Sequence, residues 1–175
     1  MKKIGIFYAP EKGSTEKVAK LIQSKLGANV ADLILVDSAT SAENFKNYES
    51  LIFAISTVGR DTWDSKYGKI GWDLFIPKIS AHNFNQQKIG IVGLGNHIMY
   101  ADTFVDSMGV LAEIVMECDG DIVGRVPADK YDFNDSQALY ADEFIGLPID
   151  EDNDSELTEK RLIHWLEVIK PEMGF

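Results

Sequence analysis

The chain has 175 residues, of which 45% are hydrophobic, and a formal net charge of −11 at pH 7. This length predicts one domain, residues 1–175, with a sizeable core, and the negative charge disfavours nucleic acid and anionic membranes as partners while favouring basic proteins. The single cysteine, Cys118, excludes an internal disulfide framework and fits the cytoplasm, and no pattern predicts a signal peptide, a membrane span or a metal centre.

Predicted strands and helices alternate along the chain. Apolar runs predict strands over residues 3–8, 30–36, 50–56, 88–95 and 121–126. Helical spacing of apolar residues predicts helices from about residue 14, over 71–79, over 101–117 and over about 155–170. The alternation favours a parallel sheet with helices on both faces, and ligands bind such sheets at the carboxyl ends of the strands. The loops to examine therefore begin at Ala9, Thr57 and Gly95.

The first of these loops reads "APEKGST". Gly13, Ser14 and Thr15 offer backbone N–H groups and two hydroxyls where a helix begins, and the helix dipole adds partial positive charge. A phosphate suits this arrangement, although the same residues also serve as a simple helix cap. The pattern is not a Walker A loop, because the first glycine and the closing Gly-Lys-Ser/Thr are missing.

The other two loops differ in what they offer. "STVGRDTWDSKYGKIG" is long and rich in glycine, which indicates function rather than mere connection. In "IVGLGNHIMYADTF", Ile98 stands where a dinucleotide fingerprint needs its third glycine, so a nicotinamide site is disfavoured. Tyr100 is placed either to stack on a planar ligand or to pack on its neighbours. His97 is interpreted as a solvated loop histidine, because no partner is spaced to work with it.

A long polar excursion, residues 127–142, precedes another short apolar run at residues 143–149. The stretch from "VGRVPADKYDF" to "LTEKRLIHWL" resembles the insertion and last helix of the long-chain flavodoxins, "IGIFYAPEKGSTEKVAKLI" resembles their phosphate loop, and "VGLGNHIMYADTF" resembles their loop with a flavin-stacking tyrosine. This resemblance implies a flavodoxin-like α/β fold, with a five-stranded parallel sheet in the order 2-1-3-4-5, helices on both faces, and an insertion that splits the fifth strand.

The same resemblance implies a function. Flavodoxins hold FMN noncovalently and carry low-potential electrons between redox proteins, using the semiquinone/hydroquinone couple without turning over a substrate of their own. A cytoplasmic monomer is expected. Two alternatives stay open: a flavodoxin-like quinone reductase with a nicotinamide donor, and an interaction module on the same fold that binds FMN poorly.

The cofactor-binding residues implied by the resemblance come from the three loops. They are Pro10, Glu11, Lys12, Gly13, Ser14, Thr15, Thr57, Val58, Gly59, Trp63, Gly95, Asn96, Tyr100 and Asp102.

The chain departs from the family pattern both in the loop expected to bind the FMN phosphate and in the loop expected to cover the flavin ring. Pro10 and Lys12 stand where hydroxyl residues are usual, and Pro10 supplies neither a hydroxyl nor an N–H group. We hypothesise that Lys12 compensates with charge; the alternative is an exposed lysine that touches nothing. Val58 is preferred over Trp63 for covering the inner face of the flavin.

Charged residues lead to two further expectations. Arg60, Lys66 and Lys69 lie in the loop after Thr57, and near the flavin they would make its hydroquinone potential less negative than is typical. The acidic segment 150–154 is interpreted either as a docking patch for a basic partner or as a solvated entrance to the last helix.

Overall fold

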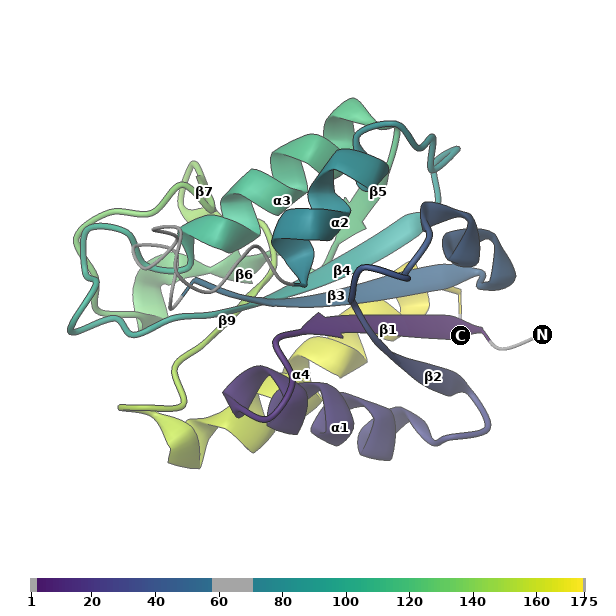
Figure 1. Ribbon diagram of the computed structural model, residues 1–175. Coiled ribbons are helices and arrows are strands. Elements are labelled where there is room, and N and C mark those ends of the chain that lie inside the picture. Colours follow the sequence, from purple (N-terminus) through teal and green to yellow (C-terminus); the bar gives the residue numbers. More distant parts are fainter. Residues whose placement is uncertain (1–2, 58–70, 175) are drawn as a thin grey trace.

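The computed structural model describes residues 3–57 and 71–174, and a parallel sheet forms its centre (Figure 1). Within these residues the sheet has the strands β1 (Ile4–Ala9), β2 (Ala31–Leu35), β3 (Ser50–Ser56), β4 (Lys88–Leu94), β5 (Asp121–Val123) and β9 (Leu147–Ile149). The strand order is β2-β1-β3-β4-β5, and β9 also pairs with β4. The predicted order is confirmed. The central strands β1, β3 and β4 are buried on both faces, which explains their nearly continuous apolar sequences.

Helices cover both faces of the sheet. In Figure 1, α1 (Ser14–Leu26) and α4 (Ser155–Glu172) lie below the sheet, while α2 (Trp72–Ile79) and α3 (Asp106–Glu117) lie above it. Each face has its own apolar core: residues such as Val18 and Trp165 pack below the sheet, and residues such as Phe75 and Leu111 pack above it. A short 3-10 helix, η1 (Ala42–Asn47), joins β2 to β3.

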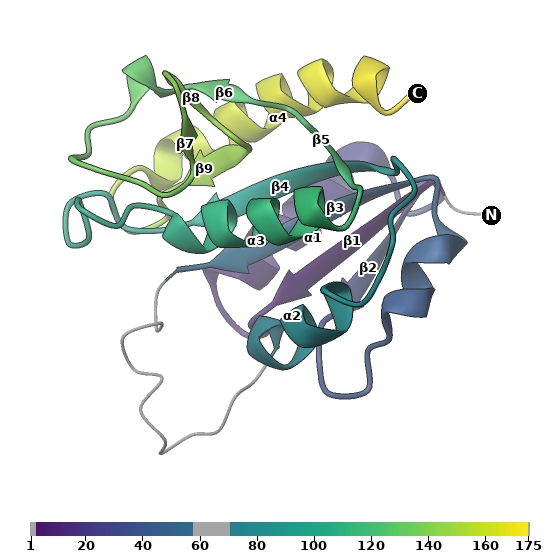
Figure 2. The same ribbon diagram turned by 90° about the horizontal axis from the view of Figure 1, so that it is seen from above.

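Two strands share the position of the fifth strand. β5 pairs with the first half of β4, from Lys88 to Gly90, and β9 pairs with the second half, from Val92 to Leu94. Between them, residues 124–146 form the 3-10 helix η3 (Ala128–Lys130) and a small antiparallel sheet of β6 (Val126–Pro127), β7 (Leu139–Tyr140) and β8 (Glu143–Phe144). Figure 2 shows this segment beside β9. We call residues 124–146 the insertion.

The expected strand 121–126 is wrong beyond Val123. Gly124 has a φ of 81°, and a Cβ atom there would lie 2.4 Å from Cγ2 of Ile169. The chain therefore turns out of the large sheet where only glycine fits between the sheet and α4. The apolar run 143–149 is divided as well, into β8 and β9.

The expected helix 101–117 begins five residues late, at Asp106. Val105 adopts a left-handed conformation with a φ of 50°, which does not continue a helix towards the N-terminus. Phe104 is fully buried, but its backbone N–H donates to the carbonyl of Asp135 in the insertion. Residues before Asp106, which the periodicity assigned to the helix, therefore make backbone hydrogen bonds to the insertion instead.

The glycines that imitated a dinucleotide fingerprint have a packing role. A Cβ atom on Gly93 would lie 2.7 Å from Cβ of Met108, and one on Gly95 would lie 3.1 Å from the backbone nitrogen of Val105. Both glycines therefore allow α3 and the segment before it to approach β4 closely.

Candidate functional site

The first loop at the carboxyl end of the sheet, residues 10–15, leads into α1, and we call it the α1 loop. Its residues from Pro10 to Ser14 are exposed, and Thr15 is buried. Gly13 is the N-cap of α1 and supplies no side-chain hydrogen bond, so the first-turn N–H groups lack the usual cap. A Cβ atom on Gly13 would meet nothing within 4 Å. Among residues 3–57 and 71–174, donors without a side-chain cap, open space beside Gly13 and the helix dipole together fit an anion such as a phosphate.

Lys12 contributes an exposed charge to this loop. Its side chain is 84% exposed, and Nζ lies 3.8 Å from Oε1 of Glu11. Its backbone has a φ of 60°, and its N–H donates to Oε2 of Glu16 at 2.5 Å. The Lys12 amide is therefore occupied by a carboxylate of the protein, while its ammonium group lies in solvent.

Glu16 holds the shape of the α1 loop. Its carboxylate accepts from Nζ of Lys20 as well as from the Lys12 amide, and the distance to Lys20 is 2.5 Å. These bonds, the one from Lys20 foremost, hold the pKa of Glu16 below its ordinary value, so the carboxylate is ionised at neutral pH. This carboxylate was not predicted as part of the site.

The loop after β3 is described only at its first residue. The backbone N–H of Thr57 donates to the carbonyl of Leu94 at 2.9 Å, and its hydroxyl accepts from the N–H of Ser107 at 3.2 Å. Thr57 thus ties β3 to β4 and to the first turn of α3. Val58, Gly59 and Trp63 lie outside the described residues, as do Arg60, Lys66 and Lys69.

Residues 95–105 connect β4 to α3, and we call them the β4–α3 loop. The first residues of this loop are buried and hydrogen-bonded within the protein. Gly95 is buried and donates to the carbonyl of Ile149 at 3.0 Å. Asn96 is 7% exposed, and its Oδ1 accepts from the N–H groups of Ile98 and Met99 at 3.1 and 2.7 Å. The Asn96 side chain therefore holds the conformation of the loop by binding its backbone N–H groups, and it does not point into solvent.

Tyr100 and Asp102 occupy the middle of the β4–α3 loop. Tyr100 is half-buried, and its N–H donates to the carbonyl of Asn96 at 3.0 Å. Asp102 is exposed and accepts from Nδ2 of Asn134 at 2.8 Å, while the backbone N–H groups of Asn134 and Asp135 both donate to the carbonyl of Ala101. The insertion therefore holds the loop just beyond Tyr100.

The interpretation of His97 as a solvated loop histidine is wrong. Its side chain is 15% exposed, and Nδ1 lies 2.6 Å from Oδ2 of Asp150, a carboxylate that is 1% exposed. The backbone N–H of His97 donates to the same oxygen at 2.9 Å. Burial pushes the pKa of Asp150 up, but the hydrogen bonds from Asn153 and His97 outweigh it and bring the pKa below its ordinary value. No sequence signal pairs residues 53 positions apart.

The acidic segment 150–154, expected to be either a docking patch or a solvated entrance to the last helix, makes bonds within the molecule. Asp150 is buried on His97, Glu151 is bound by Nζ of Lys17 at 2.6 Å and by the Thr158 hydroxyl, and Asp152 accepts from Nδ2 of Asn96 at 3.0 Å. Asp154 pairs with Arg161 at 2.9 Å. Each of these carboxylates has a partner within the molecule, and together these bonds hold the segment that leads into α4.

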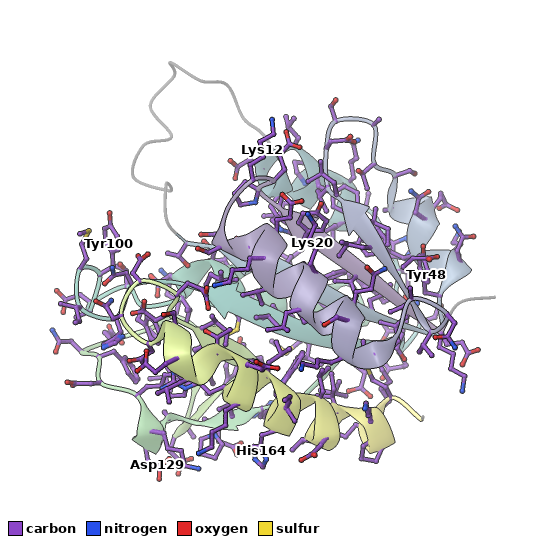
Figure 3. All side chains as sticks on the ribbon, turned by 90° about the horizontal axis from the view of Figure 1, so that it is seen from below. Lys12, Lys20, Tyr48, Tyr100, Asp129 and His164 are labelled. Carbon is purple, nitrogen blue, oxygen red and sulfur yellow. The ribbon has the colours of Figure 1, made fainter. Side chains whose placement is uncertain are left out.

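β1, β3 and β4 run parallel, so the α1 loop and the β4–α3 loop both leave the sheet at the carboxyl ends of its strands. Figure 3 shows Lys12 of the first loop and Tyr100 of the second, both apart from Tyr48. The structure thus places the α1 loop and the β4–α3 loop at the same edge of the sheet. No cluster of His, Cys, Asp or Glu suited to a metal ion occurs within residues 3–57 and 71–174. Among those same residues, no helix is long and apolar enough to cross a membrane.

Comparison with known proteins gives one consistent family. A family model described as flavodoxin matches residues 6–165. A flavodoxin from Synechocystis sp. is 38% identical over 172 residues, which cover 98% of this chain and 98% of that protein. A flavodoxin from Haemophilus influenzae is 36% identical over 171 residues, with coverages of 97% and 95%.

A solved structure agrees with these sequence matches. The crystal structure of a Fusobacterium nucleatum flavodoxin bound to flavin mononucleotide superposes with a TM-score of 0.83 at 28% sequence identity, covering 98% of this chain and 99% of that one. The likeness extends over the sheet, both helical layers and the insertion, because nearly the whole chain is covered.

Proposed function

The chain belongs to the flavodoxin family, and on that premise we propose how its loops hold the flavin and how it meets its partners. The protein is an FMN-dependent electron-transfer protein and carries electrons rather than turning over a substrate. FMN supplies the redox chemistry when bound. The residues of the chain bind and orient it, and they set its surroundings.

The flavin phosphate is proposed to bind at the α1 loop. The observation that carries this proposal is the first turn of α1, where Gly13 gives no side-chain cap and leaves open space beside the first-turn N–H groups. Ser14 and Thr15 add hydroxyl donors. Pro10 adds none, and the Lys12 amide is bound to Glu16. The cradle therefore depends on the backbone of residues 13–16 more than on side chains before Gly13.

The flavin ring is proposed to lie between the loops after β3 and β4. Tyr100 is a half-buried aromatic side chain of the β4–α3 loop, whereas Phe104 of the same loop is fully buried, and we assign Tyr100 to stacking on one face of the ring. Hydrogen bonds hold the loop and its flanks in place. They are made by Thr57, Gly95, Asn96 and Asp102.

Residues outside the described part complete the proposed site. Val58 is assigned to the other face of the ring, with Trp63 as the alternative, and Gly59 to the backbone beside it. The sequence supports this assignment only through its likeness to the family pattern.

The partners are proposed to be redox proteins with basic surfaces. The net charge of −11 supports long-range attraction of such partners. Because the carboxylates of residues 150–154 are engaged internally, the attraction is assigned to the summed charge and not to that segment. A cytoplasmic monomer is part of the proposal, and the free thiol of Cys118 suits a reducing compartment.

An anaerobic reductive titration of the FMN-loaded protein tests this function. We expect the flavin to take up its two electrons in two separate steps, and we expect no oxidation of NADH or NADPH by the protein alone. Uptake of both electrons in one step, together with turnover of a nicotinamide and a quinone, would identify a reductase instead.

A further inference from the structure

Asp150, directly after β9, is a buried carboxylate that no part of the proposed flavin site uses. Its side chain is 1% exposed. Its Oδ1 accepts from the N–H groups of Asp152 and Asn153, both at 2.9 Å, and its Oδ2 accepts from Nδ2 of Asn153 at 2.8 Å. The remaining bonds to Oδ2 come from the backbone and the ring of His97. Burial of an ionised carboxylate is costly unless such donors surround it.

The bonds from His97 connect this carboxylate to the β4–α3 loop. The N–H of His97 is fixed by Asp150, those of Ile98 and Met99 by Oδ1 of Asn96, and that of Tyr100 by the carbonyl of Asn96. Every backbone N–H group from residue 97 to residue 100 therefore has a partner inside one network. A second link joins the same elements, because Nδ2 of Asn153 also donates to Oδ1 of Asn96 at 3.0 Å.

Apolar burial does not hold this part of the loop. Ile98 and Met99 are 68% and 70% exposed, although they immediately precede Tyr100. Phe104 and Val105, at the far end of the loop, are fully buried, but Ile98 and Met99 gain little from the hydrophobic effect because they face solvent. The conformation of residues 97–100 therefore depends on the polar network centred on Asp150 and Asn96.

We infer that Asp150 is a positioning residue that holds the β4–α3 loop in the conformation that presents Tyr100 to the flavin ring. The inference rests on the proposed flavin site. A loop that is ordered before binding does not have to be ordered by the ligand, so the affinity for the ring rises without any contact between Asp150 and the ligand. Asp150 acts on the ring end of the site only, because its partners lie in the β4–α3 loop and in the segment before α4.

The test compares Asp150→Asn with Glu151→Gln. Glu151 is the neighbouring carboxylate and is 6% exposed, but its partners are Lys17 on α1 and Thr158 on α4. The matched variant therefore removes a buried charge without touching the β4–α3 loop. Dissociation constants of the apoprotein for FMN and for riboflavin are measured by titration, together with hydrogen exchange of the backbone amides of residues 97–100.

We expect Asp150→Asn to weaken FMN and riboflavin alike, each by about tenfold, which corresponds to one charge-assisted hydrogen bond. Exchange at residues 97–100 should accelerate while the amides of β4 stay protected. Glu151→Gln should change both dissociation constants less than about twofold. If Asp150→Asn does not fold, His97→Ala removes one bond to the carboxylate and should weaken both ligands by about threefold.

Two results would overturn the inference: equal effects of Asp150→Asn and Glu151→Gln, or a loss of FMN affinity with riboflavin unaffected. For His97→Ala, unchanged affinities would do the same. A wild-type apoprotein that binds neither FMN nor riboflavin is a different outcome, because it contradicts the proposed flavin site itself.

Discussion

The α1 loop and the β4–α3 loop lie at the same end of the sheet but are built in opposite ways. The α1 loop is exposed and leaves the first-turn N–H groups of its helix without a side-chain cap. The β4–α3 loop directs its backbone donors to Asn96 and Asp150, and the insertion holds it from the other side. The first loop therefore offers donors to a ligand, whereas the second offers a fixed shape. The α1 loop then accounts for the affinity for a phosphate, and the β4–α3 loop for the affinity for a flat ring.

The largest expected effect compares a glycine of α3, the helix that follows the β4–α3 loop, with the glycine of the α1 loop. A Cβ atom on Gly109 of α3 would lie 2.3 Å from the carbonyl oxygen of Gln137, so Gly109→Ala should push the insertion away from the helix. We expect the free energy of unfolding of the apoprotein to fall by about 2–3 kcal/mol in denaturant titrations. Gly13→Ala in the α1 loop is the matched control; as an exposed N-cap substitution it should lower the free energy of unfolding by less than about 1 kcal/mol. Similar losses in both variants would mean that the α1 loop is packed as tightly as the insertion.

The next effect depends on pH and concerns the β4–α3 loop alone. The pKa of Asp150 is lowered in the folded protein, so its carboxylate stabilises the fold at pH values above the unfolded pKa, near 3.9. That contribution is lost as the pH falls through the lower, folded pKa. Asp150→Asn should therefore lower the free energy of unfolding by about 1.5 kcal/mol at pH 7, and the difference from wild type should shrink below about pH 4. A difference that stays constant down to pH 3 would show that the charge of Asp150 is not what stabilises the loop.

Removing the aromatic ring should affect binding rather than folding. Tyr100→Ala is expected to weaken FMN and riboflavin by about 1 kcal/mol each, or roughly fivefold, because one stacking face is lost. Tyr100→Phe keeps the ring and should stay within about twofold of wild type. Fluorescence titration of the apoprotein measures both ligands. If Tyr100→Ala binds both as well as wild type does, Tyr100 packs on its neighbours and does not contact the ring.

The smallest expected effect belongs to the α1 loop. The Lys12 ammonium group is 84% exposed, so its attraction for a phosphate is screened by water and salt. Lys12→Ala should weaken FMN about twofold at low ionic strength, have no effect at high ionic strength, and leave riboflavin unchanged. If Lys12→Ala binds FMN as tightly as wild type does at every salt concentration, Lys12 does not compensate for the missing hydroxyls.

The sequence predicted the parallel sheet well, because its strands are apolar runs between polar loops. Residues 50–56 were predicted as a strand and form β3, and the alternation of elements led to the correct layers. The errors lie where a tertiary contact overrides a local pattern. Gly124 ends β5 because α4 leaves no room for a side chain, and the backbone of Asp135 holds the Phe104 N–H that periodicity assigned to a helix.

The candidate site was only partly predictable, for the same reason. The loops and Tyr100 follow from where the strands end. Two contacts depend on the folded backbone: the bond from the Lys12 amide to Glu16, and the pair of His97 and Asp150. The sequence does not reveal whether a carboxylate will be buried. Residues 150–154 looked like a solvated acidic run, yet a lysine, an arginine, a histidine and two asparagines bind them in the fold.

The most direct test of the division between the two loops is to titrate the wild-type apoprotein with FMN and with riboflavin, in the absence and presence of inorganic phosphate. We predict that FMN binds at least about tenfold more tightly than riboflavin, since it alone places a charged phosphate on the helix N-terminus. Inorganic phosphate should weaken FMN and leave riboflavin unchanged. Equal affinities for the two flavins, with no effect of phosphate on either, would contradict the assignment of the α1 loop to the phosphate.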